Sequence, residues 1–471
     1  MIGRCSTGAS SRHSFISRLL ADQCQAWVKR GRSAVFTVHC ATLAESSLHA
    51  GTPLTTEPST SESTAALVDA SENKGVASLT DEQLHRNAEL LEMLRGKLIL
   101  APLTKGGNLP FRRLCADFGA EVTMSEMSFA RHLLRGDPTE KARLKRSANE
   151  ACFGFQIATN NIGEGVRAGA LAAEAGASWM DLNCGCPIYE ATKRGLGSAL
   201  LRNPRKLARL VAGIAEGIDL PLTVKVRLGT SASKINVQQV VSLLQDAGAA
   251  AVIVHGRTAE QRYKKPADWT LMADVARSNE VPVVGNGDIL TYYEAQQRLN
   301  DSGCLAHMVG RGALIKPWIF QEVKEGRELN LDATERLGIY RQLVSHMKEH
   351  FGDDSKGRRK AFYFLPWHFD FLCRYRHLPE EVYRASSEER PLIGQRMETA
   401  ASELGEELDS LPVLERLLRC QSTDAHAEIA AALWDSSSDA EAKSVLEQLG
   451  NGKLADWESN NDDREERVAE G

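Results

Sequence analysis

The feature that most constrains this fold is a regular alternation of short apolar runs and helical patterns between about residues 97 and 310. Stretches with helical periodicity, such as Ile162–Ala175 and Pro204–Glu216, lie between several of the runs. This alternation is typical of parallel strands joined by crossover helices. Eight runs are present, the number of strands that a closed barrel needs: Leu98–Ala101, Glu121–Met124, Phe153–Ile157, Trp179–Leu182, Leu222–Val226, Ala251–Val254, Val281–Val284 and Met308–Val309.

A doubly wound open sheet is the competing topology for such a pattern. A sheet of that kind that binds a dinucleotide usually carries a GxGxxG motif after its first strand. The sequence has no such motif there. We therefore predict an α/β protein with a TIM (β/α)8 barrel over residues 95–328.

Residues 1–80 are interpreted as an extension ahead of the barrel. The first 50 residues contain several Arg and Lys, frequent Ser and Thr, and only two acids, Asp22 and Glu45. That composition is typical of an organelle transit peptide, with a disordered extension or a misassigned start codon as alternatives. A transit peptide would place the protein in a mitochondrion or plastid, whereas the cytoplasm or nucleus is expected otherwise. Residues 51–78 are interpreted as a linker.

The strand pattern ends after the last apolar run. Residues 329–432 are predicted to form a small all-helical domain, with helical patterns at 333–350, 357–375 and 391–419. Residues 433–471 are polar and increasingly acidic, which predicts a frayed helix and then a largely disordered tail.

Composition excludes several classes of protein. The 471 residues are 42% hydrophobic and 25% charged, which are ordinary globular values. No apolar run approaches the roughly 18 residues that a bilayer crossing needs, so we expect no membrane association. A net charge of −5 argues against a uniformly basic nucleic-acid binder but permits local basic patches. The ten cysteines show no disulfide or metal-site spacing, so reduced thiols and no bound metal are expected.

The polar residues at the ends of the predicted strands are the candidate functional set, because function in a barrel collects where strands end and loops begin. The two last strands end in glycine-rich segments, Gly285–Asp288 and Gly310–Gly312. Glycines let backbone N–H groups approach a phosphate, and Arg311 can pair with its charge. These two ends together predict a phosphate site.

Other strand ends carry groups that suit an electron-rich heterocycle. Lys225 is an inward-facing cation that needs an anionic or hydrogen-bonding partner, which the N1–O2 edge of a reduced flavin would provide. Gln156 can both donate and accept, as a pyrimidine edge requires. His255 ends the sixth strand, although a lone strand-end histidine is more often structural. Each signal is weak alone, and their combination in order is much stronger.

Cys186 is the candidate catalytic residue. It lies between Gly185 and Pro187, which holds its thiol in a tight loop at the rim. A free cysteine is commonly a small buried hydrophobe, a role that suits Cys184 better. A Cys-x-Cys pair also suggests metal or redox chemistry, but no further Cys or His cluster accompanies it.

At these residues the sequence resembles the tRNA-dihydrouridine synthases, flavoenzymes that reduce uridines in tRNA. The resemblance covers about residues 95–390, with the NxGCP, Lys-strand, HGRT and GNGD motifs in the family's order. The segments EQRYKKPADW and ALIKPWIF look most like the eukaryotic branch that acts on position 47. The matching segments are LAPLTKGGNLPFRRLC (100–115), DLNCGCPIYEATKRGLGSALL (181–201), LTVKVRLG (222–229), VHGRTAEQRYKKPADW (254–269), GNGDIL (285–290) and GRGALIKPWIF (310–320).

The resemblance implies reduction of the C5=C6 bond of uridine to 5,6-dihydrouridine. Cys186 would donate the proton to C5, and NADPH or NADH would reduce the flavin by binding transiently over it. The resemblance implies that FMN is held by Pro102, Leu103, Thr104, Gln156, Lys225, His255, Asn286, Gly287, Asp288, Gly310 and Arg311.

The resemblance also implies a tRNA partner, held in part by the helical domain, with mRNA as a further candidate substrate and a monomeric enzyme. Members of the branch typically carry zinc fingers ahead of the barrel, and this sequence has none, so the modified position stays open. The expected contacts to substrate or RNA are Asn183, Lys193, Arg194, Arg227, Arg257, Arg262, Lys264, Arg358, Arg359 and Lys360, with Arg202, Arg205, Lys206, Lys265, Lys356, Arg374 and Arg376 as further basic candidates.

Two other functions remain open at this point. An FMN barrel that reduces small enones or dihydropyrimidines would share the flavin residues but has no need of a basic helical domain. A catalytically idle RNA-binding protein is disfavoured because Cys186, Lys225 and His255 are all present. For any single basic residue, a solvated helix face is also a sufficient explanation.

Overall fold

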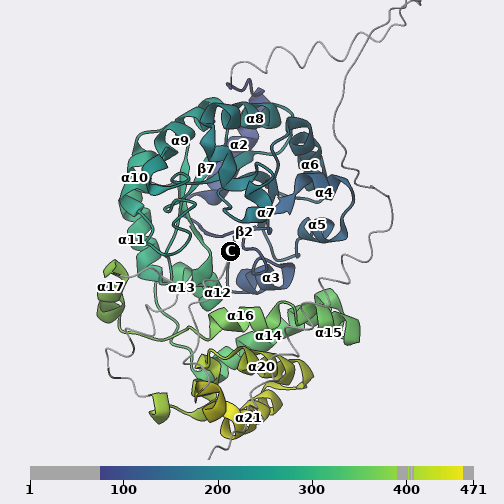
Figure 1. The fold of residues 1–471 in the computed structure, drawn as a ribbon, viewed down its shortest axis with the longest axis vertical. Coiled ribbons are helices and arrows are strands. Elements are labelled where there is room, and N and C mark those ends of the chain that lie inside the picture. The colour runs from purple at the N-terminus through teal and green to yellow at the C-terminus, as the bar shows by residue number, and fades with distance from the viewer. Residues whose placement is uncertain (1–74, 390–400, 402–404, 406–407, 460–471) are drawn as a thin grey trace, which may run out of the picture. The chain divides into compact units, whose positions relative to one another are not determined.

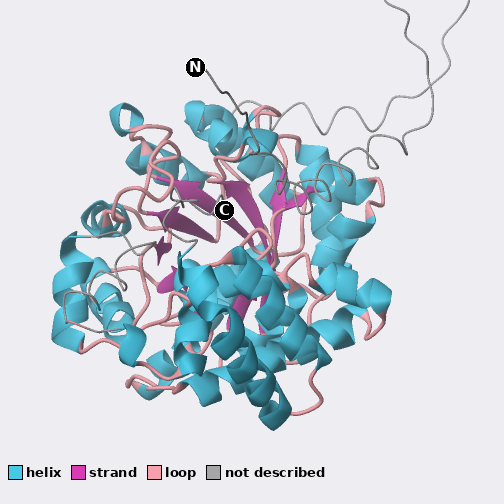
Figure 2. Ribbon diagram, turned by 60° about the horizontal axis from the view of Figure 1, so that its bottom comes forward, coloured by secondary structure: helices cyan, strands magenta, loops and turns pink. Residues whose placement is uncertain are grey.

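The computed structural model describes residues 75–389, 401, 405 and 408–459. The segment with transit-peptide composition and most of the predicted linker lie outside these residues, as do residues 391–400, 402–404 and 406–407 of the helical pattern predicted at 391–419. The described residues fold around a ring of strands enclosed by helices (Figures 1 and 2).

Eight parallel strands close into a barrel, as predicted. β1 pairs with β2 on one side and with β9 on the other, and β2 pairs with β4, which excludes an open sheet. Around the barrel the order is β1 (Leu98–Leu100), β2 (Val122–Met124), β4 (Cys152–Ala158), β5 (Trp179–Cys184), β6 (Leu222–Arg227), β7 (Ala251–His255), β8 (Val283–Asn286) and β9 (Ala306–Val309).

One short strand was not predicted. β3 (Ser128–Phe129) pairs with the end of β4, with Ser128 opposite Ile157. β2 and β3 therefore extend along the same neighbour, β4, and residues 125–127 interrupt them. A two-residue strand has no detectable alternation, so the sequence carries no signal for it.

Helices follow most strands and cover the outside of the barrel. They are α3 (Leu109–Asp117), α4 (Ala130–Leu134), α5 (Pro138–Arg143), α6 (Ile162–Glu174), α7 (Tyr189–Thr192), η1 (Gly197–Arg202), α8 (Pro204–Glu216), η2 (Ala232–Lys234), α9 (Val237–Asp246), α10 (Trp269–Arg277), α11 (Tyr292–Ser302), α12 (Arg311–Ile315) and α13 (Ile319–Glu325).

Helix α8 shows how the sequence specifies these elements. Asn203 caps its start by accepting a hydrogen bond from the Lys206 N–H at 3.1 Å, and Pro204 occupies the first turn, where its missing N–H costs nothing. Its buried side chains recur at helical spacing and pack against the outside of the barrel: Leu207, Leu210, Val211 and Ile214.

The N-terminal end of the barrel is closed by α2 (Asp81–Leu94). Thr80 and Gln83 form a capping box at its start. Leu90 and Leu94 are buried in the same cluster as the inward-facing side chains of the lower barrel, including Trp179. A Cβ on Gly154 would lie 2.3 Å from the Trp179 ring, so glycine is required there. This end is filled, which leaves the opposite end for a ligand.

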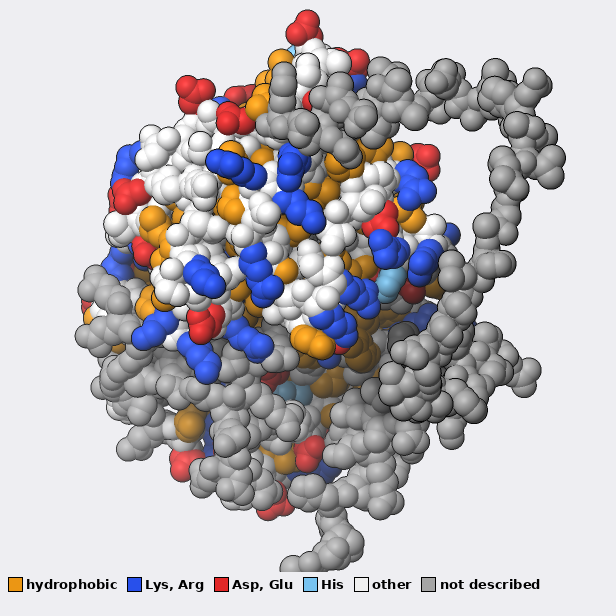
Figure 3. All heavy atoms as spheres, turned by 45° about the horizontal axis from the view of Figure 1, so that its top comes forward, with side chains coloured by type: hydrophobic (Ala, Val, Ile, Leu, Met, Phe, Trp, Pro, Cys, Tyr) orange, Lys and Arg blue, Asp and Glu red, His pale blue; other side chains and the backbone are white. Residues whose placement is uncertain are grey.

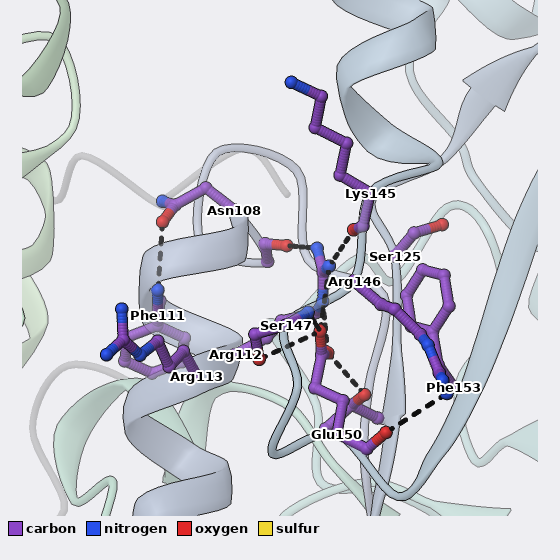
Figure 4. Close-up of polar contacts among 12 residues, drawn as sticks. Asn108, Phe111, Arg112, Arg113, Ser125, Lys145, Arg146, Ser147, Glu150 and Phe153 are labelled. Atoms are coloured by element: carbon purple, nitrogen blue, oxygen red, sulfur yellow. Dashed lines mark hydrogen bonds and ion pairs between the residues drawn. The ribbon is translucent and has the colours of Figure 1, made fainter. Parts of the chain in front are cut away.

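A buried ion pair fixes the start of the barrel wall (Figure 4). Arg112 Nε lies 2.7 Å from Glu150 Oε1, and both side chains are almost completely buried. Thr123 Oγ1 donates to the same carboxylate at 2.6 Å, and the Arg112 guanidinium donates to the carbonyls of Gly107 and Lys145. The pair therefore joins α3, β2 and the loop that follows β1.

The C-terminal domain is helical, as predicted, and consists of α14 (Ala333–Phe351), α15 (Ser355–Ala361), α16 (Leu365–Leu372), α17 (Glu380–Glu389), η3 (Leu408–Ser410), α19 (Val413–Arg419), α20 (Thr423–Asp435) and α21 (Asp439–Ser459). Two of its helices contact the barrel: α14 packs against α3, and α16 packs against α12. Within the helical domain, α16 also packs against α20. The prediction of a single helix at 357–375 is wrong. The helix is interrupted between α15 and α16, and Pro366 occupies the first turn of the second helix.

The predicted boundary at residue 433 is also wrong. α21 is a 21-residue helix that packs on α19 and α20, so at least residues 439–459 belong to the helical domain. Leu446, Leu454 and Trp457 are buried along it. None of the helices in the described ranges combines the length and apolarity that a bilayer crossing requires.

Candidate active site

A cavity of about 1050 Å³ opens at the C-terminal end of the barrel strands. Active sites of barrel enzymes occupy this end. Cys186, Asn183, Arg227 and Arg257 line the cavity. So does every residue predicted to hold the cofactor: Pro102, Leu103, Thr104, Gln156, Lys225, His255, Asn286, Gly287, Asp288, Gly310 and Arg311.

Strand register brings these side chains to neighbouring levels at one end of the barrel. Asn183 on β5 is opposite Lys225 on β6, and Arg227 is opposite His255 on β7. His255 is in turn opposite Asn286 on β8. Side chains alternate between the two faces of a strand, so residues at every second position point into the barrel. The polar residues thus form the upper layers of a core whose lower layers are apolar.

A directional chain of hydrogen bonds connects the barrel interior to the Cys186 loop. Gln156 Nε2 donates to Asp181 Oδ2 at 2.8 Å, which leaves Gln156 Oε1 to accept from Asn183 Nδ2 at 2.9 Å. Asn183 Oδ1 then accepts from the N–H groups of Cys186 at 2.9 Å and Gly185 at 3.2 Å. Because a carboxylate only accepts, Asp181 sets the orientation of both amides. Each amide keeps one N–H for a ligand.

Asp181 is completely buried and does not line the cavity. Burial raises its pKa, and hydrogen bonds from Thr223 and Gln156 together with the charge of Lys225 oppose that rise. Thr223 Oγ1 donates to Asp181 Oδ1 at 2.6 Å. Asp181 was not predicted, although its place two residues before Asn183 on β5 put it on the same inward face.

Lys225 presents its ammonium group inside the barrel. It donates to Asn286 Oδ1 at 2.8 Å, and Asn286 Nδ2 donates to the Met308 carbonyl at 2.8 Å, which fixes the orientation of that amide. Burial lowers the pKa of Lys225, as does the charge of Arg227, while the charge of Asp181 opposes them. A ligand with negative charge at this position would therefore raise the pKa of Lys225 again and stabilise its ammonium form.

The Cys186 thiol sits at the rim of the cavity and is half-buried. Its loop is held on the far side by η1, because the Ser198 N–H donates to the Cys186 carbonyl at 2.9 Å. Gly197 adopts φ 59°, and a Cβ there would lie 2.4 Å from that carbonyl, so glycine is required. Burial raises the pKa of the Cys186 thiol, which keeps it protonated at neutral pH. Cys184, as expected, is fully buried in the core.

The opposite end of the cavity is strongly basic. Asp288 Oδ2 lies 2.5 Å from Arg257 Nη2 and accepts from the Ala267 N–H, while Asp288 Oδ1 lies 3.1 Å from Arg311 Nη2. Burial raises the pKa of Asp288, but Arg257 and Arg311 outweigh it and leave the pKa below its ordinary value. The Arg311 guanidinium lies 4.0 Å from the centre of the Tyr263 ring, and its Nη1 is buried without a hydrogen-bond partner among the described residues.

His255 is held neutral. Burial lowers its pKa well below the ordinary value, and the charges of Arg227, Lys225, Arg257 and Arg311 lower it further. Arg257 Nη1 lies 3.3 Å from His255 Nε2, a contact that suits an acceptor nitrogen on the imidazole. The ring can therefore offer hydrogen bonds but no charge to a ligand.

The glycines of the last two strand ends serve close packing as well as ligand access. A Cβ on Gly312 would lie 2.0 Å from the Ile289 carbonyl oxygen, and one on Gly287 would lie 2.5 Å from Ala267 Cβ. Gly287 also has φ 142°. Any larger residue at either position would displace the loop that carries Asp288.

Three aromatic residues of the cavity were not predicted. Trp367 and Phe371 come from α16 of the helical domain, and Tyr263 comes from the loop after β7. Gly106 admits the Trp367 ring, since a Cβ there would lie 2.9 Å from it. The sequence marks 362–371 as an aromatic helical segment, but which face meets the barrel depends on tertiary contacts.

Three of the residues predicted to contact substrate or RNA are buried. Arg257 is completely buried and bonds Asp288, His255 and the Lys265 carbonyl, so it positions the cavity wall instead. Arg376 is buried too, and its guanidinium donates to the carbonyls of Cys373 and Tyr375. Arg227 is buried with its guanidinium on the Thr258 and Arg262 carbonyls, but it still lines the cavity.

The other predicted RNA contacts lie at the surface, which leaves that prediction open. Lys193 pairs with Glu190 at 2.7 Å, and Arg358 pairs with Asp435. Arg374 is paired with Asp370. The remaining residues are exposed: Arg194, Arg202, Arg205, Lys206, Arg262, Lys264, Lys265, Lys356, Arg359 and Lys360.

Comparison with known proteins identifies the family. A profile of the dihydrouridine synthase (Dus) family matches residues 99–403, which is more than half of the 471-residue chain. The chain belongs to the dihydrouridine synthase family. The matched region of this Dus chain covers the barrel with its cavity and extends into the helical domain, and it confirms the resemblance predicted from the motifs.

Curated relatives carry names of the same family. A Xenopus tropicalis protein, tRNA-dihydrouridine(47) synthase [NAD(P)(+)]-like, is 40% identical over 319 residues, which are 65% of this chain and 50% of the relative. The human protein of the same name is 41% identical over 284 residues, 60% of this chain and 44% of the relative. The chain thus spans about half the length of the curated relatives it matches. An old yellow enzyme from Trypanosoma cruzi is a distant structural match, with a TM-score of 0.39 and 10% identity over 50% of this chain and 90% of that one.

Proposed function

We propose that this protein reduces the C5=C6 bond of a uridine in tRNA to 5,6-dihydrouridine, with bound FMN and with NADPH or NADH as the source of electrons. The observation that carries the proposal is one cavity, in a chain of the dihydrouridine synthase family, that holds the Cys186 thiol at its rim and the Lys225 side chain within. The names of the relatives support tRNA as the substrate and position 47 as the site.

The residues of the cavity fit FMN. The partnerless Arg311 Nη1 is a buried donor that a phosphate would satisfy. Burial lowers the pKa of Arg311 to about 9, which still leaves the guanidinium charged at neutral pH. At the other end, Lys225, Gln156 and the neutral His255 offer donors and acceptors to a pyrimidine edge. When bound, FMN supplies the hydride that C6 of the uracil ring receives.

The protein's own residues supply the proton and the charge. Cys186 is proposed to give its proton to C5 from the opposite face of the uracil, because burial holds the thiol protonated. Lys225 would stabilise negative charge that develops opposite it, in a site where burial strengthens the interaction. Asp181, Gln156 and Asn183 would hold the Cys186 loop in place.

The nicotinamide dinucleotide is proposed to enter the same cavity transiently. The residues proposed to hold the flavin line this cavity, so a nicotinamide that enters it would lie beside the flavin. We propose that the enzyme acts as a monomer. A uridine in a loop of mRNA presents the same base, so mRNA is a second substrate under the same proposal.

The Cys186→Ala variant tests the proposal. We expect it to fold and to keep its yellow flavin absorbance, while turnover of tRNA falls by about 10²–10⁴-fold, the usual contribution of general acid catalysis. Cys184→Ala, which removes a buried thiol outside the cavity lining, is the matched control and should keep most activity. Normal single-turnover reduction of tRNA by Cys186→Ala would refute the role of the thiol. A purified protein without flavin would instead support a non-catalytic RNA-binding function.

A further inference from the structure

A second hollow, of about 850 Å³, lies on the same rim of the barrel. We call it the rim groove and define it by Phe129, Arg131, His132, Arg135, Glu164 and Arg194. It shares no lining residue with the main cavity. Lys and Arg side chains are spread over the barrel face shown in Figure 3, with a histidine among them.

The rim groove has an excess of positive charge. Its one carboxylate, Glu164, is already engaged, because Arg131 Nε lies 2.7 Å from Oε1 and Thr159 Oγ1 donates to Oε2 at 3.1 Å. Neither Arg135 nor Arg194 forms an ion pair with another residue in the part of the chain that the structure describes. Both are exposed. Two unneutralised guanidinium groups thus face the groove.

Arg194 is held in place for a ligand. Its guanidinium lies over the Phe129 ring at 5.0 Å, and its Nη1 lies 3.3 Å from His132 Nε2. Its carbonyl accepts from Asn160 Nδ2 at 3.1 Å, which ties this loop to the end of β4. Ordering the side chain before binding lowers the entropy that a ligand must offset.

We propose that the rim groove binds a backbone phosphate of the RNA substrate, next to the nucleotide that enters the cavity. Guanidinium groups match phosphate oxygens in a paired geometry, and an anion would remove the excess charge of Arg135 and Arg194. This inference rests on the proposed function, since it assumes an RNA substrate.

The position of the rim groove supports this assignment. Phe129 and Leu196 of its wall belong to the same apolar cluster as Met127, Ile188 and the catalytic Cys186. A nucleotide whose base reaches Cys186 must leave its stack, at a cost of a few kcal/mol. A phosphate held across this cluster would help to offset that cost, and it would anchor the strand beside the base.

A phosphate on NADPH is the other source of the same chemistry. The groove and the main cavity have separate linings, and the Cys186 loop contributes to the main cavity alone. A dinucleotide seated in the cavity would have to cross that loop to reach Arg135. An RNA strand that lies along the rim would contact both the groove and the cavity mouth, so we assign the groove to RNA.

The test compares Arg135→Gln/Arg194→Gln with the wild-type holoenzyme by tRNA binding over a range of salt concentrations. Because the groove is proposed to hold one phosphate, and each phosphate contact contributes about 0.7–0.9 to the slope of log K against log salt, the slope should fall by about 0.7–0.9. One such contact raises the affinity at 0.1 M salt about five- to eight-fold relative to 1 M salt, so the tRNA affinity of the variant should fall by about five- to eight-fold at 0.1 M salt.

The control is Arg95→Gln/Arg277→Gln, which removes the same charge. Arg95 and Arg277 are exposed and lie in ion pairs, with Glu92 and Asp274, away from the rim. This variant should keep the wild-type slope to within about 0.3, since exposed paired charges contribute little.

Three outcomes would overturn the assignment to RNA. One is an unchanged slope and affinity in Arg135→Gln/Arg194→Gln when the wild type reduces tRNA. A second is an equal loss in the control variant, which would indicate a general effect of charge. A third is a rise in the KM for NADPH with unchanged tRNA affinity, which would assign the groove to the dinucleotide. If the wild type binds tRNA but does not reduce it, the proposed function fails while the groove proposal is still tested by the slopes.

Discussion

Protonation of His368 should weaken the contact between the helical domain and the cavity. His368 is completely buried on α16, stacked on Phe111 with ring centres 4.7 Å apart. Its Nε2 lies 3.1 Å from Asn108 Nδ2, and its Nδ1 has no hydrogen-bond partner among the described residues. Burial lowers the pKa of His368 to about 3, so the folded protein keeps the ring neutral. The adjacent Trp367 lines the cavity.

The size of the effect follows from linkage. An unfolded histidine has a pKa of about 6.5, so below that pH the unfolded chain takes up a proton that folded His368 refuses. Stability is therefore fully present above pH 6.5 and falls as the pH drops. The loss is about 1.4 kcal/mol per pH unit, or about 2 kcal/mol at pH 5, and it approaches about 5 kcal/mol as the pH nears the folded pKa of about 3.

The assay compares the free energy of unfolding of wild type and His368→Gln at pH 7.5 and pH 5, by urea titration followed through tryptophan fluorescence. Glutamine is neutral and can still accept from Asn108, so the variant should lose about 2 kcal/mol less than the wild type between the two pH values. His85→Gln on α2, at an exposed position, should lose as much as the wild type. If His368→Gln and wild type lose equal stability, the buried neutral state of His368 is refuted.

Two further variants test the buried charges. Glu150→Gln should reduce the free energy of unfolding by about 3–5 kcal/mol in urea titrations, because it leaves the Arg112 charge buried and unpaired. The control Glu121→Gln, at the exposed pair with Lys97, should reduce it by less than about 1 kcal/mol. Equal losses in the two variants would refute the stabilising role of the buried pair. Asp181→Asn removes the negative charge that stabilises the Lys225 ammonium, so it should lower the pKa of Lys225 further, on the order of one pH unit. The basic limb of the pH profile of flavin reduction should then move to lower pH. An unmoved basic limb would show that Lys225 does not control that step.

The barrel was predictable because its strands are buried on both faces. A strand such as β6 therefore reads as an apolar run, and the inward Lys225 stands out within it. The cavity residues from strand ends were predictable for the same reason, since strand ends meet at one edge whatever the details of packing. β3 was missed because two residues carry no periodicity.

The errors share a physical origin in tertiary contacts. The acidic composition around α21 hid its buried side chains, Leu446 and Trp457, whose exposure is decided by packing against α19 and α20. Trp367 enters the cavity because Gly106 leaves room for it, a match between segments far apart in sequence. Arg257, two residues after His255, was predicted to contact substrate or RNA, but it is buried in the cavity wall, where it pairs with Asp288. A charge pattern alone does not tell which partner a cation has.

Desolvation explains how one cavity can hold both an acid and a set of cations. Burial raises the pKa of Cys186 and lowers that of His255, so both groups are uncharged at neutral pH. The charge in the lining then belongs to Lys225 and three arginines, while among the described residues Asp288 is its one carboxylate. Such an excess costs folding free energy that an anionic ligand would recover. The excess charge therefore destabilises the ligand-free barrel, and binding of the phosphate-bearing cofactor that we propose would recover that free energy, while burial keeps Cys186 protonated.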